Sequence, residues 1–167
     1  MAALAAVAPG LAGAADEVVS LTASERAWLK DHPTIRLTPD PLLPPYEFFD
    51  DDGTFLGIGA EFVALLEKKT GIRFEVVRVD DWKESVARTK VRKNDVWSVV
   101  AETPGLAEYM LFTDPYIVSP AVIVVRSDVE LRLAVKGLKV AIADGYAVHE
   151  TLKERHPDLN STRCPIR

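Results

Sequence analysis

The side chains best placed to bind a small molecule lie in polar loops that follow apolar runs. Glu102 and Thr103 follow Val96–Val100, and Gly145–Ala147 follows Leu138–Ala143. In open α/β sheets, ligands bind where the carboxyl end of a strand leads into a helix. We therefore expect backbone N–H groups at Thr103 and at Gly145–Ala147 to attract a ligand carboxylate, and Glu102 to accept a hydrogen bond from a ligand ammonium.

Three aromatic residues could complete such a site. Tyr46 and Tyr146 each offer a ring and a hydroxyl that could cover a ligand. Trp82 could contact a ligand from the edge of the sheet, or its ring could pack over the start of its own helix. For each candidate, the structural alternative is a loop residue that satisfies its own turn.

The residues needed for catalysis are scarce. His149 and His156 are seven positions apart, unlike the i, i+4 pair of a zinc protease, and no Gly-x-Ser-x-Gly or phosphate loop occurs. The aspartates at 50–52 lack the spacing of a calcium loop. Gly57 and Gly59 lack the third glycine of a dinucleotide fingerprint, because Phe62 takes that place. The sequence predicts a binding protein that is not an enzyme, with no metal and no cofactor.

Composition excludes several partners. A net charge of -5 with scattered basic residues gives no footprint for nucleic acid. The run Met1–Ala15 is rich in Ala and Leu and ends in small residues, so we expect an export signal that is cut near Ala14 or Ala15. It is too short to span a bilayer, and no other membrane-spanning candidate occurs. Cys164 is the one cysteine, so no internal disulfide can form.

The hydrophobic pattern predicts alternating helices and strands. Thr22 and Glu25 form a capping box that begins a helix. Gly71 has the type that ends a helix, and either Asp80 or Asp81 caps the helix that starts at Trp82. A helix that starts at Ile58 should bury Ile58, Phe62, Leu65 and Leu66 on one face. The predicted helices are Ala23–Asp31, 58–70, Trp82–Lys90, a short one from Asp128 towards Gly137, and one from Ala147 to Arg155. The predicted strands are Thr34–Thr38, Tyr46–Phe49, Thr54–Leu56, Ile72–Val79, Val96–Val100, Ala121–Val125 and Leu138–Ala143, and the runs at 96–100 and 121–125 should be buried on both faces.

Several motifs resemble a known family. Asp95-Val96, Thr103-Pro104 and the segment Phe112–Tyr116 are similar, in order and spacing, to family 3 of the extracellular solute-binding proteins. The resemblance extends from about Leu21 to Asn160. It implies an α/β, type II periplasmic-binding-protein-like fold with two lobes that close on a solute, with lobe 1 nearly complete and lobe 2 only begun.

The resemblance also implies a division of the chain. Residues 1–15 would be the leader, 16–33 an N-terminal capping helix and 34–118 lobe 1. Residues 119–127 would cross between the lobes, 128–160 would begin lobe 2, and 161–167 would be an atypical tail that does not resemble the next family strand. We expect a truncated chain whose lobe 2 piece is poorly ordered or packs on another chain, because it has little surface to bury.

Departures from the family bear on the ligand. Amino-acid binders of this type carry an Arg three residues after the motif Thr, where this chain has Leu106. They also carry a loop aromatic where it has Leu43. Losing the Arg removes a bidentate carboxylate contact, so the sequence argues against a standard α-amino acid as the ligand.

The resemblance implies a periplasmic domain that binds a small polar solute, such as an amino acid or a related compound, for transport or for sensing. Its partner would be a membrane transporter or a histidine kinase, and the chain by itself should bind weakly. The leader helix with Thr22, Glu25, Trp28 and His32-Pro33 resembles sensor modules of two-component histidine kinases. The alternative is therefore a sensory module that needs no ligand.

Overall fold

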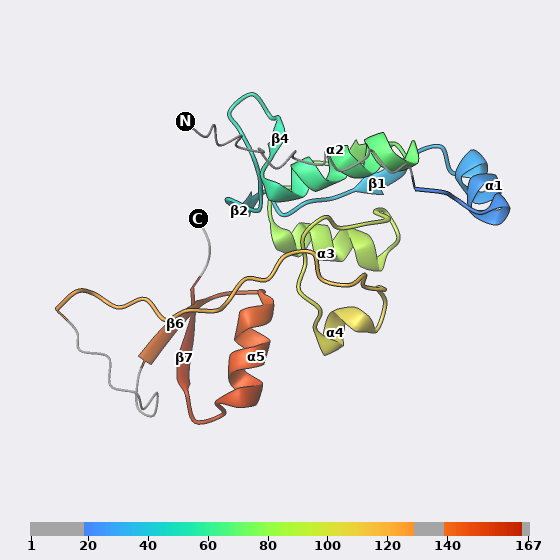
Figure 1. Ribbon diagram of the computed structural model, residues 1–167. Coiled ribbons are helices and arrows are strands. Elements are labelled where there is room, and N and C mark those ends of the chain that lie inside the picture. The colour runs from blue at the N-terminus through green and yellow to red at the C-terminus, as the bar shows by residue number, and fades with distance from the viewer. Residues whose placement is uncertain (1–18, 129–138, 165–167) are drawn as a thin grey trace, which may run out of the picture.

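Two α/β units, and a long extended segment that follows the first of them, make up the described part of the protein (Figure 1). The structure, a computed structural model, describes residues 19–128 and 139–164. No helix within these two ranges is both long and apolar enough to cross a membrane. The predicted leader at 1–15 and the predicted helix after Asp128 fall mainly outside the described residues.

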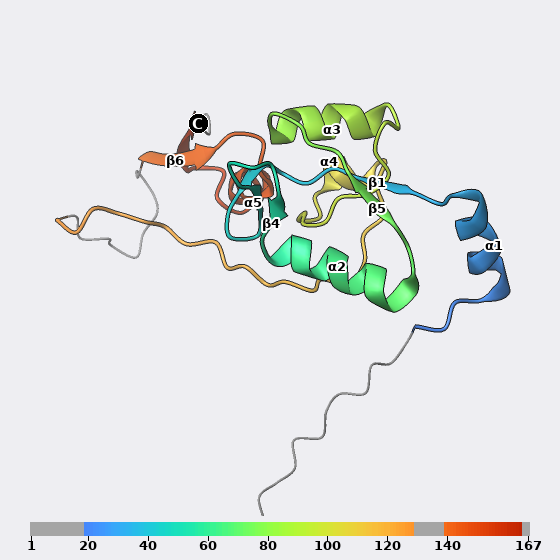
Figure 2. The ribbon, with the colours of Figure 1, turned by 90° about the horizontal axis from the view of Figure 1, so that it is seen from above.

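The first unit is built on a small parallel sheet. Strand β1 (Ile35–Leu37) pairs in parallel with β5 (Phe74–Val76), and Val96 adds a parallel bridge to Leu37 on the other side of β1. Helices α2 (Ile58–Thr70) and α3 (Trp82–Lys90) lie on opposite sides of these strands in both views (Figures 1 and 2). This arrangement buries Leu37 of β1, which is 1% exposed, and leaves Ile35 and Arg36 half-buried.

A three-stranded antiparallel sheet follows β1 and leads into α2. It consists of β2 (Leu42–Leu43), β3 (Glu47–Phe49) and β4 (Phe55–Leu56), in the order β2-β3-β4. The predicted hairpin between β3 and β4 is confirmed. Gly57 joins this sheet to α2 with φ +109°, and a Cβ there would lie 2.5 Å from the Tyr46 carbonyl oxygen, so only glycine fits.

The helix ends follow the predicted capping residues. In α1 (Ala23–Asp31), Thr22 and Glu25 form both hydrogen bonds of a capping box. Asp81 accepts the Glu84 N–H at the start of α3, and Gly71 ends α2 in the left-handed conformation. Helix α1 nevertheless buries none of its residues and projects from one end of the first unit (Figure 1).

The second unit is a strand–helix–strand motif. Strand β6 (Lys139–Ala143) leads through α5 (Ala147–Arg155) to β7 (Asn160–Cys164), which pairs in parallel with β6 over five residues. The predicted strand and helix are confirmed. The prediction that residues from 161 onwards do not form the next strand is wrong, because Ser161–Cys164 continue β7 despite their polar side chains.

The two predicted central strands differ from the structure. In Val96–Val100 only Val96 bridges to β1, because Trp97 turns inward and is 6% exposed while the backbone leaves the sheet. The run Ala121–Val125 is extended but exposed, with Val122 at 76% and Val124 at 87%. It crosses between the units (Figure 1), and no described strand lies beside it to accept its hydrogen bonds.

The buried face of α2 is also shifted from the prediction. Ile58, Leu65 and Leu66 are exposed, and the buried residues are Gly59 and Val63. Gly59 sets this rotation, since its N–H donates to the Tyr46 carbonyl at 2.8 Å and a Cβ would meet the Val99 side chain at 2.8 Å. The helix therefore approaches the first unit along its glycine side.

Candidate functional site between the two units

The two units meet through the loops at the carboxyl ends of their strands. The Trp82 indole Nε1 at the start of α3 donates to the Gly145 carbonyl, which follows β6, at 3.2 Å. The neighbouring Lys83 Nζ lies 2.9 Å from Asp144 Oδ2, and Arg163 of β7 lies 3.6 Å from Asp144 Oδ1. The Lys83 hydrogen bond is the largest cause that lowers the pKa of Asp144.

A tyrosine of the second unit reaches a buried carboxylate of the first. Tyr146 begins α5, and its hydroxyl donates to Asp40 Oδ2 at 2.5 Å. Asp40 follows β1, is 1% exposed, and accepts the Leu42 N–H on Oδ1 at 2.9 Å. Burial first, and then the bond to Asp40, raise the pKa of the Tyr146 phenol.

A second carboxylate, Glu47, lies beside Asp40. It is fully buried, accepts the Asp40 N–H on Oε1 at 2.8 Å, and accepts the Ser98 hydroxyl on Oε2. Burial raises the pKa of Glu47 to about 7, against the opposing effect of these hydrogen bonds. Asp40 and Glu47 thus form an acidic floor, which is the name used below for these two residues.

Aromatic residues make further contacts within the first unit and with the crossing segment. The Tyr116 hydroxyl donates to the Ser98 carbonyl, and burial raises the pKa of Tyr116 to about 12. Tyr46 shares a hydrogen bond of 2.7 Å with the Ser119 hydroxyl, on the crossing segment. The rings of Trp82 and Trp97 pack at 5.0 Å, so Trp82 packs against Trp97 in the first unit and also contacts the second unit.

The predicted site residues divide into two groups. Trp82, Gly145 and Tyr146 come together at the contact between the units, and Tyr46 joins the crossing segment. Thr103 is buried, but its hydroxyl accepts the Leu106 N–H and caps the four-residue helix α4 (Pro104–Ala107). Glu102 is exposed. Thr103 therefore satisfies the hydrogen bonds of its own turn, which the sequence analysis gave as the alternative to ligand binding.

The acidic floor is the part of the site that the sequence prediction missed. Asp40 directly follows the first strand and Pro39, so the rule that ligands lie at strand carboxyl ends could have selected it. Glu47 gives no such signal, because it is one acid among apolar residues of a hairpin. Its burial depends on Ser98, 51 positions away.

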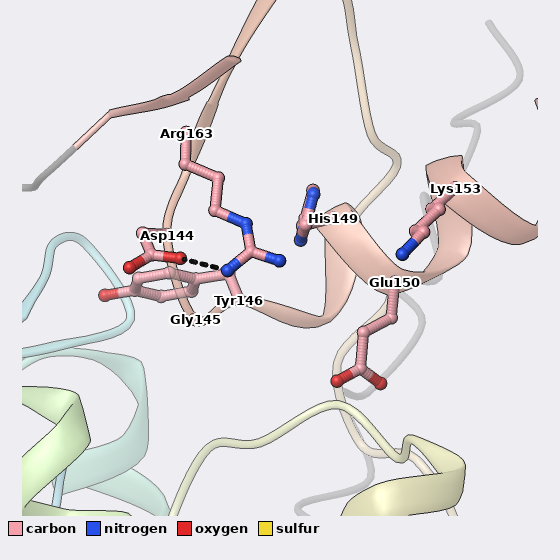
Figure 3. A pocket seen from close by; sticks show the side chains of 7 residues that line it. All are labelled: Asp144, Gly145, Tyr146, His149, Glu150, Lys153 and Arg163. Carbon is pink, nitrogen blue, oxygen red and sulfur yellow. Dashed lines mark ion pairs between the residues drawn. The ribbon is translucent and has the colours of Figure 1, made fainter. Parts of the chain in front are cut away.

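The described residues enclose two hollows. One of about 320 Å³ lies in the second unit and is lined by Gly145, Tyr146, His149, Lys153 and Arg163, among others (Figure 3). Figure 3 shows Arg163 reaching from β7 towards Asp144, with the Tyr146 hydroxyl pointing away from Arg163. A second hollow, of about 420 Å³, lies between the hairpin, α2 and β5, away from the contact between the units. No group of three or more potential metal ligands occurs within the described ranges.

Comparison with known proteins points to sensors and to amino-acid binders. The chain is 28% identical over 143 residues to the sensor protein EvgS of Escherichia coli K12, and 29% identical over 139 residues to the virulence sensor protein BvgS of Bordetella pertussis. These matches cover 84% and 81% of this chain but only 12% and 11% of the two sensors. The chain therefore spans about an eighth of the length of these relatives.

Solved structures share the fold. The crystal structure of the BvgS periplasmic VFT2 domain matches with a TM-score of 0.77 and 27% identity, over 87% of this chain and 63% of that one. The ancestral amino-acid-binding protein AncCDT-1, described as a precursor of cyclohexadienyl dehydratase, matches with a TM-score of 0.69 and 22% identity, over 83% and 64%. Both show the two-lobed Venus-flytrap architecture expected from the sequence, of which this chain holds a part.

The family model for bacterial extracellular solute-binding proteins, family 3, matches residues 35–161, which include both α/β units, the crossing segment and the acidic floor. This protein belongs to that family of solute-binding proteins.

Proposed function

We propose that this chain is the periplasmic solute-binding domain of a sensor, with a histidine kinase as its partner. It is a binding domain rather than an enzyme, and its ligand is a small polar solute held between the two units. The observation that carries the proposal is the convergence of Asp40 and Trp82 from the first unit with Gly145 and Tyr146 from the second. A solute that bridges such groups would stabilise the closed pair, and a partner could read that closure.

Sensing is favoured over transport by the relatives. The curated proteins to which the chain is similar are named sensors, and the matched share of each is a small part of a longer protein. The amino-acid-binding neighbours are below 25% identity and support the fold alone. Leu106, in the place of the family's carboxylate-binding Arg, also separates this chain from standard amino-acid binders.

Thermal unfolding in the presence of solutes tests the proposal. Amino acids, small carboxylates and polyamines are each added at millimolar concentration. A ligand present at about 100 times its Kd should stabilise the folded state by about 2.7 kcal/mol, which raises the unfolding midpoint by several degrees. Trp82→Ala should abolish the shift, whereas Trp28→Ala, on the exposed helix α1, should retain it.

A ligand-independent sensory module is the second candidate. It is favoured by the direct Tyr146–Asp40 and Lys83–Asp144 contacts, which join the units with no solute between them. In that case no solute in the panel shifts the midpoint. Tyr146→Phe alone then changes the output of a kinase joined to the domain.

A thermal shift by a solute that survives Trp82→Ala would contradict the proposed location of the solute site, but it would not contradict solute binding itself.

A further inference from the structure

The run Ala121–Val125 is an extended segment with no partner strand. Its side chains are apolar and mostly branched, yet its backbone makes no hydrogen bond within residues 19–128 and 139–164 (Figure 1). Val122 is 76% exposed and Val124 is 87% exposed, whereas Ile123 and Val125, on the opposite face, are 39% and 41% exposed. A row of unpaired N–H and C=O groups beside exposed apolar side chains is a template for pairing with another strand.

The residues before this segment hold its start on the first unit. The Tyr116 ring lies 4.1 Å from the Phe62 ring of α2, and the Ser119 hydroxyl shares a hydrogen bond of 2.7 Å with Tyr46. Pro120 has no N–H to donate, so pairing begins after it. Because its start is anchored, the segment loses less backbone freedom on pairing than a free tail would.

The sequence of the segment fits a second copy of itself in the antiparallel direction. With Ile123 opposite Ile123 of the second copy, Val122 lies opposite Val124, and the exposed valines of both copies share one face. Arg126 then lies opposite Pro120, and the two arginines are about 20 Å apart along the strands. An in-register parallel pair would instead place the two arginines side by side, and like charges directly opposite each other destabilise a sheet.

We propose that two copies of this chain associate by antiparallel pairing of Ala121–Val125 about a two-fold axis at Ile123. The contact is isologous, which is the commonest arrangement in soluble dimers. Five residues a side bury less than the roughly 1,200 Å² of a standard interface, so the dissociation constant should be on the order of 100 µM. The pairing needs no solute, so it is independent of the proposed function.

Sedimentation equilibrium of the full chain, at concentrations below and above this dissociation constant, tests the association. The wild type should pass from monomer to dimer. Val124→Lys places a charge on the exposed face, opposite Val122 of the second copy, and should weaken the dimer about tenfold. Leu111→Lys is the matched control, because Leu111 is 99% exposed and lies outside the segment, and it should dimerise like the wild type.

Disulfide cross-linking tests the register. Both cysteine variants also carry Cys164→Ser, because Cys164 is exposed and could form disulfides of its own. Ile123→Cys should give a covalent dimer on mild oxidation, since the Cα atoms of directly opposed residues lie about 4.5–5.5 Å apart, within the span of a disulfide. Val118→Cys should not, although Val118 is 89% exposed, because the two copies of residue 118 would lie about 34 Å apart.

The outcomes distinguish this inference from the proposed function. A chain that stays monomeric at every concentration would overturn the inference, and so would a dimer that is unaffected by Val124→Lys. Equal cross-linking at positions 118 and 123 would overturn the antiparallel register. The substituted positions are all exposed, so the variants should keep the circular dichroism of the wild type, and the cross-linking comparison stands even if Val124→Lys does not fold. Stabilisation by a solute without any dimer would overturn this inference alone.

Discussion

Glu47 links folding to pH at the scale of a single residue. Its pKa is about 7 in the folded state, against an ordinary value of 4.5 in the unfolded chain, because burial favours the neutral acid. The folded state therefore holds its proton more tightly, and stability is present at low pH and falls as pH rises from 4.5 to about 7. The difference corresponds to about 3 kcal/mol.

Glu47→Gln should remove this dependence. The amide keeps the hydrogen-bond acceptor for the Asp40 N–H but does not ionise. Urea unfolding between pH 4.5 and 8 should give a free energy that falls with pH in the wild type and changes less in the variant. Glu75→Gln, on an exposed strand position, is the matched control. A wild-type free energy that rises through this window would contradict a neutral, buried Glu47.

The role of a residue could be predicted from the sequence where it depends on neighbours in the chain. It could not be predicted where it depends on partners that are distant in the chain. Thr22 caps its helix as predicted, and Asp81 is the one of the two predicted candidates, Asp80 and Asp81, that caps α3; both act through their own neighbours. Glu47 is buried because Ser98 and the Asp40 N–H converge on it. No spacing rule within the hairpin encodes that convergence, so the acidic floor was missed.

At the scale of elements, a helix cap should contribute to the free energy of unfolding only where its helix packs on the domain. Asp81→Ala removes the bond from the Glu84 N–H to Oδ1, 2.8 Å long, from α3, which buries Ser85 and Thr89. It should lower the free energy of unfolding by about 1 kcal/mol. Thr22→Ala breaks the capping box of α1, which buries nothing, so it should reduce helical circular dichroism without moving the urea midpoint. Equal losses in the two variants would show that α1 packs on the domain.

The elements also explain which strands were predictable. Residues 139–143 and 35–37 form strands because each has a parallel partner within the described ranges. Ala121–Val125 has the same branched composition, yet no strand among the described residues pairs with it. Composition makes a segment suitable for a sheet, but pairing decides whether it joins one. For β7 the error was the reverse. Its polar composition argued against a strand, yet its residues pair with β6.

At the scale of the whole molecule, the two units differ in how much core they hold. The first unit buries Leu37, Val63, Val79 and Trp97, whereas Ile142 is the one buried apolar side chain among the described residues of the second. Local unfolding costs less where fewer apolar side chains are buried. The second unit should therefore open more readily than the first, and its contacts with Trp82 and Lys83 should limit that opening.

Hydrogen exchange measures this difference directly. Amides of β6 and β7 should exchange faster than the Val77 amide, which donates to the Leu37 carbonyl at 2.7 Å in the first unit. Trp82→Phe keeps an apolar ring but loses the Nε1 donor to Gly145, so it should accelerate exchange in β6 and β7 while leaving Val77 unchanged. Trp28→Phe, on the exposed α1, should change neither. Equal protection of the two units in the wild type, or acceleration of both by Trp82→Phe, would mean that they unfold as one cooperative body. Closure between them could then not serve as the signal that a solute controls.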